Sequence, residues 1–566
     1  MYIPTTIQFP SLQFRSKTSI IYLLIPLTLS AFTHLWNPTG FPAFEQDEGH
    51  YMRRSMEVIQ GLGPQESKGT FFYEYDHPYF GQIFLAAALS LVNYPNSLNP
   101  SINSHSIEML YLVPRVLMGI LAVVDTFLVY KIAETSYNRK VAFISATLFA
   151  VMSSTWFLRR IYLDSIALPF ILLSILFAVY YAKKSESEYD RNIGNNKNII
   201  LILLSGIFLG LAIFTKLPVF TMIPLIVYII LKGSNRDTDG KKDTDGKNKN
   251  ARTSSKLKTL GIWFIPIALI PMIWPAYAIS MGQLDEWLDG VFWQATRADR
   301  PLAEALKSVF FRMDPVLLGL GAIGLIYSVI KKDYFILLWA FPYLIFMYFI
   351  DWVFFFHLIP VYAPFCIIGT ILLLDILKKI SNKQLCKVLE FIAFGSIIVF
   401  GFINSTLLIT QNLNYSNFRL VSFVTKSLPD KNNGVDNNSE EVTLIGPNGA
   451  FSFYWIVSQV FNRNTEFKWF EGRLDYLGGP IKTEKFLIVV DKEMRNLFSS
   501  NSSRQHIKYV SQLYDKSNLF GVFDLNISLP DFKKYPYTNI LDDVYKEHTN
   551  RRGVDWADNI EVRGNY

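Results

Sequence analysis

Charged residues are scarce in this chain of 566 residues. Asp, Glu, Lys and Arg together make up 18% of the sequence, whereas hydrophobic residues make up 51%. A soluble domain of average composition carries about a quarter charged residues, so this balance argues against a soluble protein of several domains. It predicts instead a polytopic α-helical membrane protein.

Cysteine is nearly absent: Cys366 lies in an apolar segment and Cys386 in a polar loop. Two cysteines so placed predict no structural disulfide, and they form no Cys-based metal-ligand spacing. The sequence also lacks a basic run interleaved with aromatic residues, which a groove for a nucleic-acid strand requires. We therefore expect no nucleic acid among the partners of this protein.

Long apolar segments are abundant, and about 20 apolar residues are enough to span the hydrocarbon core of a bilayer. The segment Lys216-Leu217-Pro218 separates two short apolar stretches, 199–215 and 217–232, which could also form a single span. We therefore expect about eleven transmembrane helices. The predicted spans are 19–36, 109–130, 141–158, 161–182, 199–215, 217–232, 259–279, 314–330, 333–350, 356–377 and 388–410.

The distribution of Lys and Arg over the loops predicts the orientation of the chain. Positive charges gather in one alternating set of loops, which the positive-inside rule places in the cytoplasm. We expect a cytoplasmic N-terminus, with loops 37–108 and 280–313 and everything after about Gln411 outside. The basic loops hold Arg139-Lys140, Lys183-Lys184, Lys331-Lys332, Lys378-Lys379 and the polar linker 233–258.

A change in composition near residue 411 predicts two domains. Residues 1–411 hold all the predicted spans, and residues 412–566 are rich in Asn, Ser and charges. The second part has short apolar runs at Val442–Ile445, Phe451–Phe461 and Lys485–Val490. These runs predict a strand, a helix and a strand, and hence a small soluble α/β domain.

Two further features belong to the predicted outer side. Tyr79–Val92 is apolar but too short to cross a bilayer, which indicates an interfacial helix that lies along the membrane. Asn-x-Ser sequons agree with an outside location of the C-terminal domain, because such sequons are glycosylation acceptors in secreted segments. They occur at Asn414, Asn437, Asn501 and Asn526.

Ionisable residues gather at the outer ends of the predicted spans. Such groups are costly to desolvate at a membrane, and their presence there indicates a functional site. Their convergence from five junctions at one depth predicts an active site in the interface. The candidates are Asp47, Glu48, Asp76 and His77 in the first outer loop, Arg159, Arg160 and Asp164 between the third and fourth spans, Lys216 between the fifth and sixth, Arg297 and Arg300 before the eighth, and His357 and Tyr362 at the start of the tenth.

These residue types suit the transfer of a sugar from a lipid phosphate to a hydroxyl group. Such a transfer needs a general base for the acceptor proton and cations for the charge that builds on the departing phosphate. Asp47 suits the first role; Lys216, His77 and Arg159 or Arg160 suit the second. Attack opposite the phosphate would invert the anomeric centre in one step.

Each candidate also has a plain structural explanation. Asp47-Glu48 could be a solvated pair, Asp76-His77-Pro78 a turn, and Arg159-Arg160 headgroup anchors. Asp164 could pair with a nearby Arg, and Asp125 within the second span is expected to pair inside the bundle.

Two other classes of function compete with a transferase. A transporter or flippase of a lipid-linked glycan would place charges at mid-bilayer and Gly/Pro-broken spans in matching halves, whereas here the charges gather at one face. A surface-assembly or receptor-like protein would carry its function in the C-terminal domain and would tolerate substitution of the outer-loop acids.

The same stretches resemble a family of membrane enzymes. The chain is similar to the GT-C glycosyltransferase superfamily, in the branch of dolichyl-phosphate-mannose protein mannosyltransferases and aminoarabinose lipid A transferases. The resemblance covers roughly residues 19–411 and rests on the order and side of five motifs. They are DEGHYMRRSMEVIQGLG from Asp47, YDHPYFGQIFLAA from Tyr75, LRRIYLDSIALPF from Leu158, GLAIFTKLPVF from Gly210 and FHLIPVYAPF from Phe356.

The resemblance implies a donor sugar, such as a mannose-like hexose, on a polyprenyl or dolichyl phosphate, and it implies no metal or other cofactor. It makes Asp47 the base with Glu48 beside it, brings Lys216 and His77 to the lipid phosphate, and lets Asp164 shape the acceptor or sugar site. Arg159, Arg160 and Arg297 are further phosphate candidates, and Asp76, His357 and Tyr362 are further site candidates.

The sequence departs from the family pattern at three positions. Tyr79 replaces the second Pro of the first-loop motif, Leu217 replaces the Gly after Lys216, and His77 stands where some relatives carry Lys. A neutral His is a weaker partner for phosphate than Lys. The Trp-Trp-Asp signature of oligosaccharyltransferases is absent, which disfavours transfer of a whole glycan to Asn.

Overall fold

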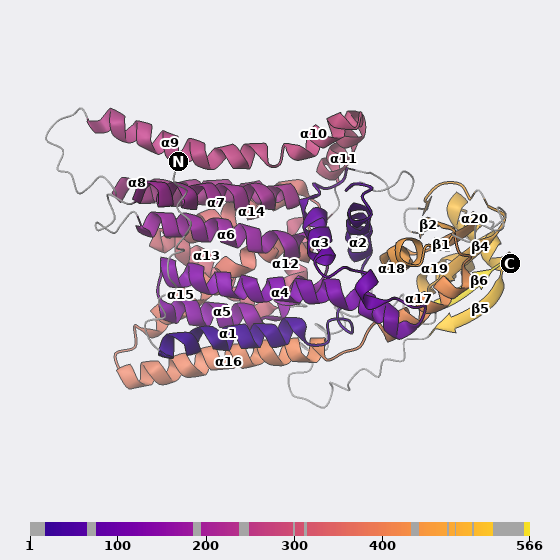
Figure 1. Ribbon diagram of the computed structural model, residues 1–566. Helices are drawn as coiled ribbons and strands as arrows, with labels where there is room; N and C mark the ends of the chain where they lie inside the picture. The colour runs from indigo at the N-terminus through magenta and orange to yellow at the C-terminus, as the bar shows by residue number, and fades with distance from the viewer. Residues whose placement is uncertain are drawn as a thin grey trace.

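The first part of the chain folds into largely apolar helices that run side by side (Figure 1). A helix satisfies its backbone hydrogen bonds within itself, which lipid requires of any spanning segment. The computed structural model describes residues 17–64, 75–184, 194–236, 248–297, 300–310, 314–431, 441–472, 475–481, 483–500, 503–523 and 560–566.

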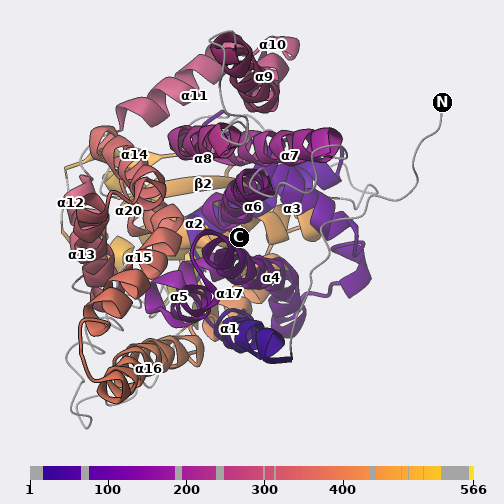
Figure 2. The ribbon, with the colours of Figure 1, turned by 90° about the vertical axis from the view of Figure 1, so that its left-hand side faces the viewer.

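Twelve of the described helices make up the bundle. Figure 2 looks along it and shows α9 and α10 at one edge. The helices are α1 (Lys17–Leu35), α4 (Ser104–Ser136), α5 (Arg139–Val151), α6 (Leu163–Lys184), α7 (Gly194–Thr215), α8 (Ile223–Arg236), α9 (Asn248–Leu269), α10 (Ile273–Ser280), α13 (Pro315–Lys331), α14 (Tyr334–Ile350), α15 (Ile359–Leu377) and α16 (Lys383–Ile409).

Shorter elements lie at the ends of the bundle, and α2 and α3 are set crosswise to it (Figure 1). Helix α3 falls within the segment expected to lie along the membrane. These elements are α2 (Gln46–Ile59), α3 (Phe80–Ser90), η1 (Asn96–Leu98), η2 (Ser153–Arg159), η4 (Leu217–Met222), α11 (Leu284–Thr296), α12 (Leu302–Ser308) and η6 (Phe355–Leu358).

Length and composition qualify six of the described helices as membrane spans, or seven if the pair α5 and η2, bent by 69°, counts as one. Four shorter apolar helices also fall on predicted spans: Ile20–Leu35, Leu217–Gly233, Pro315–Lys331 and Tyr334–Ile350. The predicted multi-pass membrane fold is confirmed, whereas the number of about eleven spans is not. Of the predicted linker 233–258, residues 237–247 lie outside the described part.

The C-terminal part contains a six-stranded sheet in the order β3-β2-β1-β4-β6-β5. Strand β1 runs parallel to β2 and β4, while β6 is antiparallel to β4 and β5. The predicted strand, helix and strand correspond to β1, α18 and β4, so the small α/β domain is confirmed. The elements are α17 (Tyr415–Ser427), β1 (Val442–Gly446), α18 (Asn448–Trp455), η7 (Ile456–Val460), β2 (Thr465–Glu471), β3 (Tyr476–Leu477), β4 (Phe486–Val490), α19 (Lys492–Ser499), α20 (Gln505–Lys516), β5 (Asn518–Phe523) and β6 (Ile560–Gly564).

One hydrophobic core joins the sheet domain to the adjacent end of the bundle. Phe44, before α2, stacks on Tyr111 of α4 at 4.2 Å between ring centroids, and Tyr111 meets Trp455 of α18 at 5.6 Å. Helices α2 and α18 also touch by their backbones, because a Cβ atom on Gly49 would stand 2.5 Å from the Cα atom of Ser452. The sheet domain is therefore packed directly onto the helix that carries Asp47.

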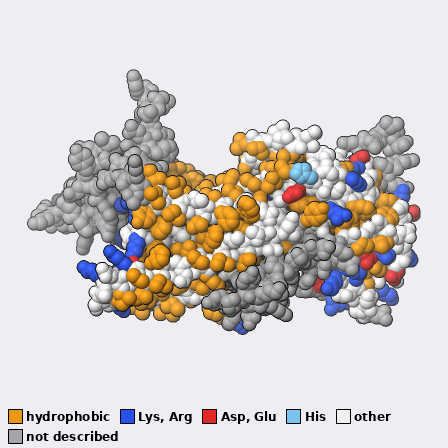
Figure 3. Space-filling view, turned by 90° about the horizontal axis from the view of Figure 1, so that it is seen from below, with side chains coloured by type: hydrophobic (Ala, Val, Ile, Leu, Met, Phe, Trp, Pro, Cys, Tyr) orange, Lys and Arg blue, Asp and Glu red, His pale blue; other side chains and the backbone are white. Residues whose placement is uncertain are grey.

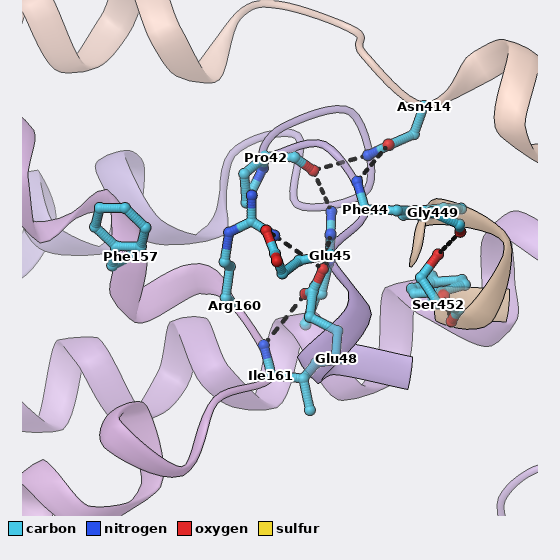
Figure 4. A network of polar contacts seen from close by, with 12 residues as sticks. Pro42, Phe44, Glu45, Glu48, Phe157, Arg160, Ile161, Asn414, Gly449 and Ser452 are labelled. Carbon is cyan, nitrogen blue, oxygen red and sulfur yellow. Dashed lines mark hydrogen bonds and ion pairs between the residues drawn. The ribbon is translucent and has the colours of Figure 1, made fainter. Parts of the chain in front are cut away.

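Asn414 ties the start of the sheet domain to the loop before α2. Its side chain is fully buried; it donates to the carbonyl oxygens of Thr39 (2.7 Å) and Pro42 (2.8 Å) and accepts from the amide of Phe44 at 3.1 Å (Figure 4). The interpretation of Asn414 as a glycosylation acceptor is therefore wrong, because a buried and fully bonded amide is out of reach of a glycan. The sequons at Asn437, Asn501 and Asn526 lie outside the described residues.

We expect Asn414→Ala to lower the thermal stability of the purified protein markedly. The change leaves buried backbone groups without partners, and each such loss costs about 1–3 kcal/mol. The measurement is the unfolding temperature in detergent, with Asn412→Ala, an exposed position two residues earlier, as the control. Equal unfolding temperatures for the two variants would contradict this role of Asn414.

Candidate active site

Asp47 and Glu48 both lie in the first turn of α2. The partial positive charge at a helix N-terminus stabilises carboxylates there, which explains why two acids are tolerated side by side. Neighbouring residues on a helix point about 100° apart, since one turn holds 3.6 residues. The two carboxylates therefore face different surroundings.

The Glu48 carboxylate is fully buried in a network of donors (Figure 4). Arg115 of α4 binds it twice, through Nε at 3.1 Å and Nη2 at 2.6 Å. The amide of Ile161 donates to it at 3.2 Å, and Arg160 approaches it at 3.4 Å. Arg115 also donates to the carbonyl oxygens of Pro38 and Pro42 at 3.0 and 2.8 Å. Glu48 thus links α2, α4 and the segment between η2 and α6.

The two adjacent arginines are buried beside this network. Arg159 donates to the carbonyl oxygen of Trp36, and its guanidinium lies 5.7 Å from the centroid of the Phe41 ring. Arg160 is 6% exposed and stacks between Trp156 and Tyr162, at 5.4 and 5.7 Å. Side chains so deeply buried do not anchor lipid headgroups at the surface.

Asp47 differs from Glu48 in its burial and in its partners. Its side chain is only partly buried, and no hydrogen-bond or ion-pair partner of its carboxylate is found within the described residues. Tyr51 follows it one turn later; burial, and then the charges of Asp47, Asp76 and Asp164, raise the pKa of Tyr51 well above its usual value. The charge of Asp47 thus acts on the same residue, Tyr51, as the charges of Asp76 and Asp164.

Asp76 locks the loop that carries His77 onto α2. Arg54 pairs with it at 2.7 Å and His50 lies 3.5 Å away, and all three side chains are nearly inaccessible to solvent. Burial alone would raise the pKa of Asp76, but the charge of Arg54 above all holds it well below its usual value. This charged pair fixes the position of the next residue, His77.

His77 is neutral in this environment. Burial lowers its pKa, Asp76 opposes the shift, and the charges of Lys216, Arg54 and Arg297 lower it further, to about 3. Its ring centroid lies 6.3 Å from that of Tyr51. The three cations thus approach His77 from three separate elements.

Lys216 stands at the break between α7 and η4. Pro218 at the start of η4 has no backbone N–H and cannot extend α7, and Lys216 itself adopts an extended backbone with φ −150°. Its ammonium group forms an ion pair with Asp164 in the first turn of α6. The predicted pairing of Asp164 with an arginine is therefore replaced by a pairing with Lys216.

The remaining candidates come from the loops before α12 and α15. Arg297 stacks on Trp293 at 3.8 Å and on Trp352 at 4.8 Å. His357 accepts from the amide of Phe354 at 3.2 Å. Tyr362 is 1% exposed and donates to the carbonyl oxygen of Phe355 at 3.2 Å. Arg297 and His357 thus lie at the same end of the bundle as Lys216. Tyr362 supports the backbone of the segment before α15.

Asp125 was expected to pair inside the bundle. It is fully buried on α4, yet neither carboxylate oxygen has a hydrogen-bond partner among the residues described. No group of three or more His, Cys, Asp or Glu residues suited to a metal ion occurs in the described part of the chain. The predicted lack of a metal cofactor stays a prediction.

Three residues of this site were missed from the sequence: Arg54, Arg115 and Gln294. For Arg115 a signal existed, because it is an arginine within the predicted span 109–130 and a charge inside a span requires a partner. Arg54 and Gln294 carried no such signal, since both lie in segments where polar residues are ordinary.

A family model of dolichyl-phosphate-mannose-protein mannosyltransferases matches residues 67–278. No curated protein is significantly similar in sequence to this chain. The matched segment begins after Asp47-Glu48 and contains the other predicted motifs up to Lys216.

Solved structures of GT-C enzymes share the fold. Archaeal oligosaccharyltransferase AglB from Archaeoglobus fulgidus, in complex with an inhibitory peptide and a dolichol-phosphate, aligns with a TM-score of 0.55 and 10% identity over 98% of this chain and 89% of that chain. ArnT from Cupriavidus metallidurans bound to undecaprenyl phosphate aligns with a TM-score of 0.51 and 11% identity over 97% and 98%. The oligosaccharyltransferase tethered with an acceptor peptide aligns with a TM-score of 0.53 and 12% identity over 80% of this chain, which spans 64% of that one.

The chain thus shares the fold of these GT-C membrane enzymes. Its predicted resemblance to the dolichyl-phosphate-mannose protein mannosyltransferases and related enzymes is confirmed by the family model and by the shared fold. The transporter alternative is not favoured, because the charged residues named above gather at one end of the bundle.

We expect Glu48→Gln to destabilise the protein far more than Asp47→Asn. Removing one partner of a buried ion pair leaves an uncompensated charge and costs about 3–5 kcal/mol, whereas Asp47 has no such partner among the described residues. Unfolding temperatures of the two variants and of the wild type in one detergent provide the test. A larger loss for Asp47→Asn would reverse the assignment of the two carboxylates.

Proposed function

We propose that the protein transfers a mannose-like hexose from a polyprenyl or dolichyl phosphate to a hydroxyl acceptor at the outer face of the membrane. The dolichol-phosphate of the AglB structure and the undecaprenyl phosphate of the ArnT structure support a donor of this kind. The acceptor is a hydroxyl of a protein, a glycan or a lipid. Residues 1–411 form the catalytic membrane domain, and residues 412–566 form a domain outside the membrane.

The proposed orientation rests on the distribution of surface charge. In Figure 3 the bundle is covered mostly by apolar side chains, with Lys and Arg at the end away from the sheet domain. The positive-inside rule assigns that end to the cytoplasm. The N-terminus then lies in the cytoplasm, and Asp47 and the sheet domain lie outside.

The partly exposed Asp47 carboxylate is the observation that carries the proposal. A general base must reach the substrate and must not be engaged by a permanent partner. Glu48 fails this requirement because Arg115 and the amide of Ile161 occupy both of its oxygens. Asp47 meets it, and its charge acts on Arg297.

In the proposed reaction, Asp47 takes the proton of the acceptor hydroxyl as the hydroxyl oxygen bonds to the anomeric carbon. The bond between that carbon and the phosphate oxygen breaks in the same step, and the lipid phosphate leaves with the electron pair. Lys216, Arg297 and a hydrogen bond from His77 stabilise the charge on the departing phosphate. Attack from the opposite side inverts the anomeric centre.

We expect Asp47→Asn to lower the rate of transfer from a dolichyl-phosphate hexose by about 10²–10⁴-fold, the usual contribution of a general base. Donor affinity should change little, since the base acts on the acceptor. Asp289→Asn, an exposed carboxylate on α11, is the matched control. Full activity of a folded Asp47→Asn variant with several donors and acceptors would disprove the role of Asp47.

Substitutions of Lys216 and of Asp164 are expected to change the affinity for the donor phosphate in opposite directions. The donor phosphate must compete with Asp164 for Lys216, so Asp164→Asn should tighten the binding of dolichyl phosphate and Lys216→Met should weaken it. We expect changes of roughly tenfold or more in each direction, because hydrogen bonds to charged groups are worth about 1.5–3 kcal/mol. Weaker binding by both variants would assign the pair to stability alone.

A further inference from the structure

Helix α11 contacts the loop that carries His77 along one of its faces. Just before the helix, Gln283 accepts a hydrogen bond from the Tyr75 hydroxyl at 2.9 Å. At Gly290 the approach is closer still, because a Cβ atom there would stand 2.5 Å from the carbonyl oxygen of Tyr75. Gln294 follows one helical turn after Gly290 and therefore lies on the same face. Its amide nitrogen meets Nδ1 of His77 at 3.3 Å.

The orientation of the Gln294 amide follows from the chemistry of Arg297. Nη1 of Arg297 donates to Oε1 of Gln294 at 3.1 Å, and a guanidinium group can only donate. The amide oxygen must therefore face Arg297, and the amide N–H group faces His77.

Arg297 is itself held in place by aromatic rings. Its guanidinium lies against the rings of Trp293 and Trp352, and Arg300 also contacts the Trp352 ring, at 4.8 Å. Arg300 is bridged by backbone hydrogen bonds to Asp351 (3.0 Å) and Val353 (2.8 Å). These contacts between indole rings and guanidinium groups leave Arg297 little freedom to turn away from Gln294.

The contact determines which nitrogen of His77 carries the proton. Nδ1 accepts from the Gln294 amide, so a neutral ring must hold its proton on Nε2. The charged and titratable groups around His77 are Asp76 on its own loop, Arg54 and Tyr51 on α2, Lys216 after α7, Arg297 after α11 and His357 on η6. The three cations among them keep the imidazole neutral.

We propose that Gln294 is a positioning residue that holds His77 in the Nε2–H tautomer, so that His77 donates a hydrogen bond to the oxygen of the lipid phosphate. This rests on the proposed function. His77 then serves the phosphate as a neutral donor and not as a second general base. The position that some relatives fill with a lysine cation is filled here by an imidazole whose donor side is set by a neighbouring amide.

Binding of dolichyl phosphate to the purified full-length protein tests the tautomer without any transfer reaction. The dissociation constant is measured from pH 5.5 to 8.5 for wild type and for Gln294→Glu. At each pH the dissociation constant of Gln294→Glu is divided by that of wild type, which cancels the effect of the ionisation of the phosphate itself. A carboxylate at 294 draws the proton to Nδ1. At high pH the neutral ring then turns a lone pair on Nε2 toward the phosphate, whereas at low pH the imidazolium donates from both nitrogens.

We therefore expect the ratio to rise with pH, by about tenfold across the range, which corresponds to about 1.4 kcal/mol. The rise should vanish in the His77→Ala background. Gln294→Leu should weaken binding equally at every pH, and Thr296→Ala, an exposed position on the same helix, should change nothing.

The outcomes separate this inference from the proposed function. Tight binding by wild type with a pH-independent ratio for Gln294→Glu would overturn the role of Gln294 and leave the donor assignment intact. A pH dependence that persists in the His77→Ala background would overturn that role as well. Failure of folded wild type to bind dolichyl phosphate at any pH would overturn the proposed function, and the role of Gln294 with it.

Discussion

The ion pair between Glu48 and Arg115 is the interaction on which the rest of the site depends. It is fully buried, and the partners of both side chains come from three separate stretches of chain: the loop before α2, helix α4, and the segment between η2 and α6. A buried charge is tolerated only when it is paired and hydrogen-bonded in this way. Once the pair forms, the first turn of α2 cannot rotate, and the direction of the neighbouring Asp47 side chain is fixed with it.

Two adjacent carboxylates thus perform different tasks. The sequence predicted that Asp47-Glu48 forms part of the site, because acids at a span boundary are costly, but it could not separate their roles. That separation depends on Arg115, which lies 67 positions from Glu48 along the chain and meets it only when α4 packs beside α2. The spans themselves were predictable, because hydropathy is a local property and each predicted segment falls on a helix. The pairing of Lys216 with Asp164 and the contact of Gln294 with His77 were not, because both follow from packing.

The sheet domain also helps to hold α2 in place. Tyr111 of α4 donates to the carbonyl oxygen of Ser452, Gln459 donates to the carbonyl oxygen of Arg53 at 3.2 Å, and Gly49 leaves no room for a side chain between α2 and α18. The C-terminal domain therefore contacts α2 on the side away from the bundle. A change in position of α18 would be transmitted to α2 through backbone contacts, which are stiffer than contacts between long side chains.

The charges that act on Tyr51 and His77 balance before any donor arrives. Asp47, Asp76 and Asp164 are three carboxylates, and Arg54, Lys216 and Arg297 are three cations, while His77 between them is neutral. The proposed donor, a polyprenyl phosphate, would bring the surplus negative charge. Of the three cations, Arg54 is held by Asp76 and Lys216 by Asp164, so full neutralisation of the phosphate requires Lys216 to change partner. That exchange leaves Asp164 without its cation only while the donor is bound, which links the occupancy of the phosphate site to the charge next to Asp47.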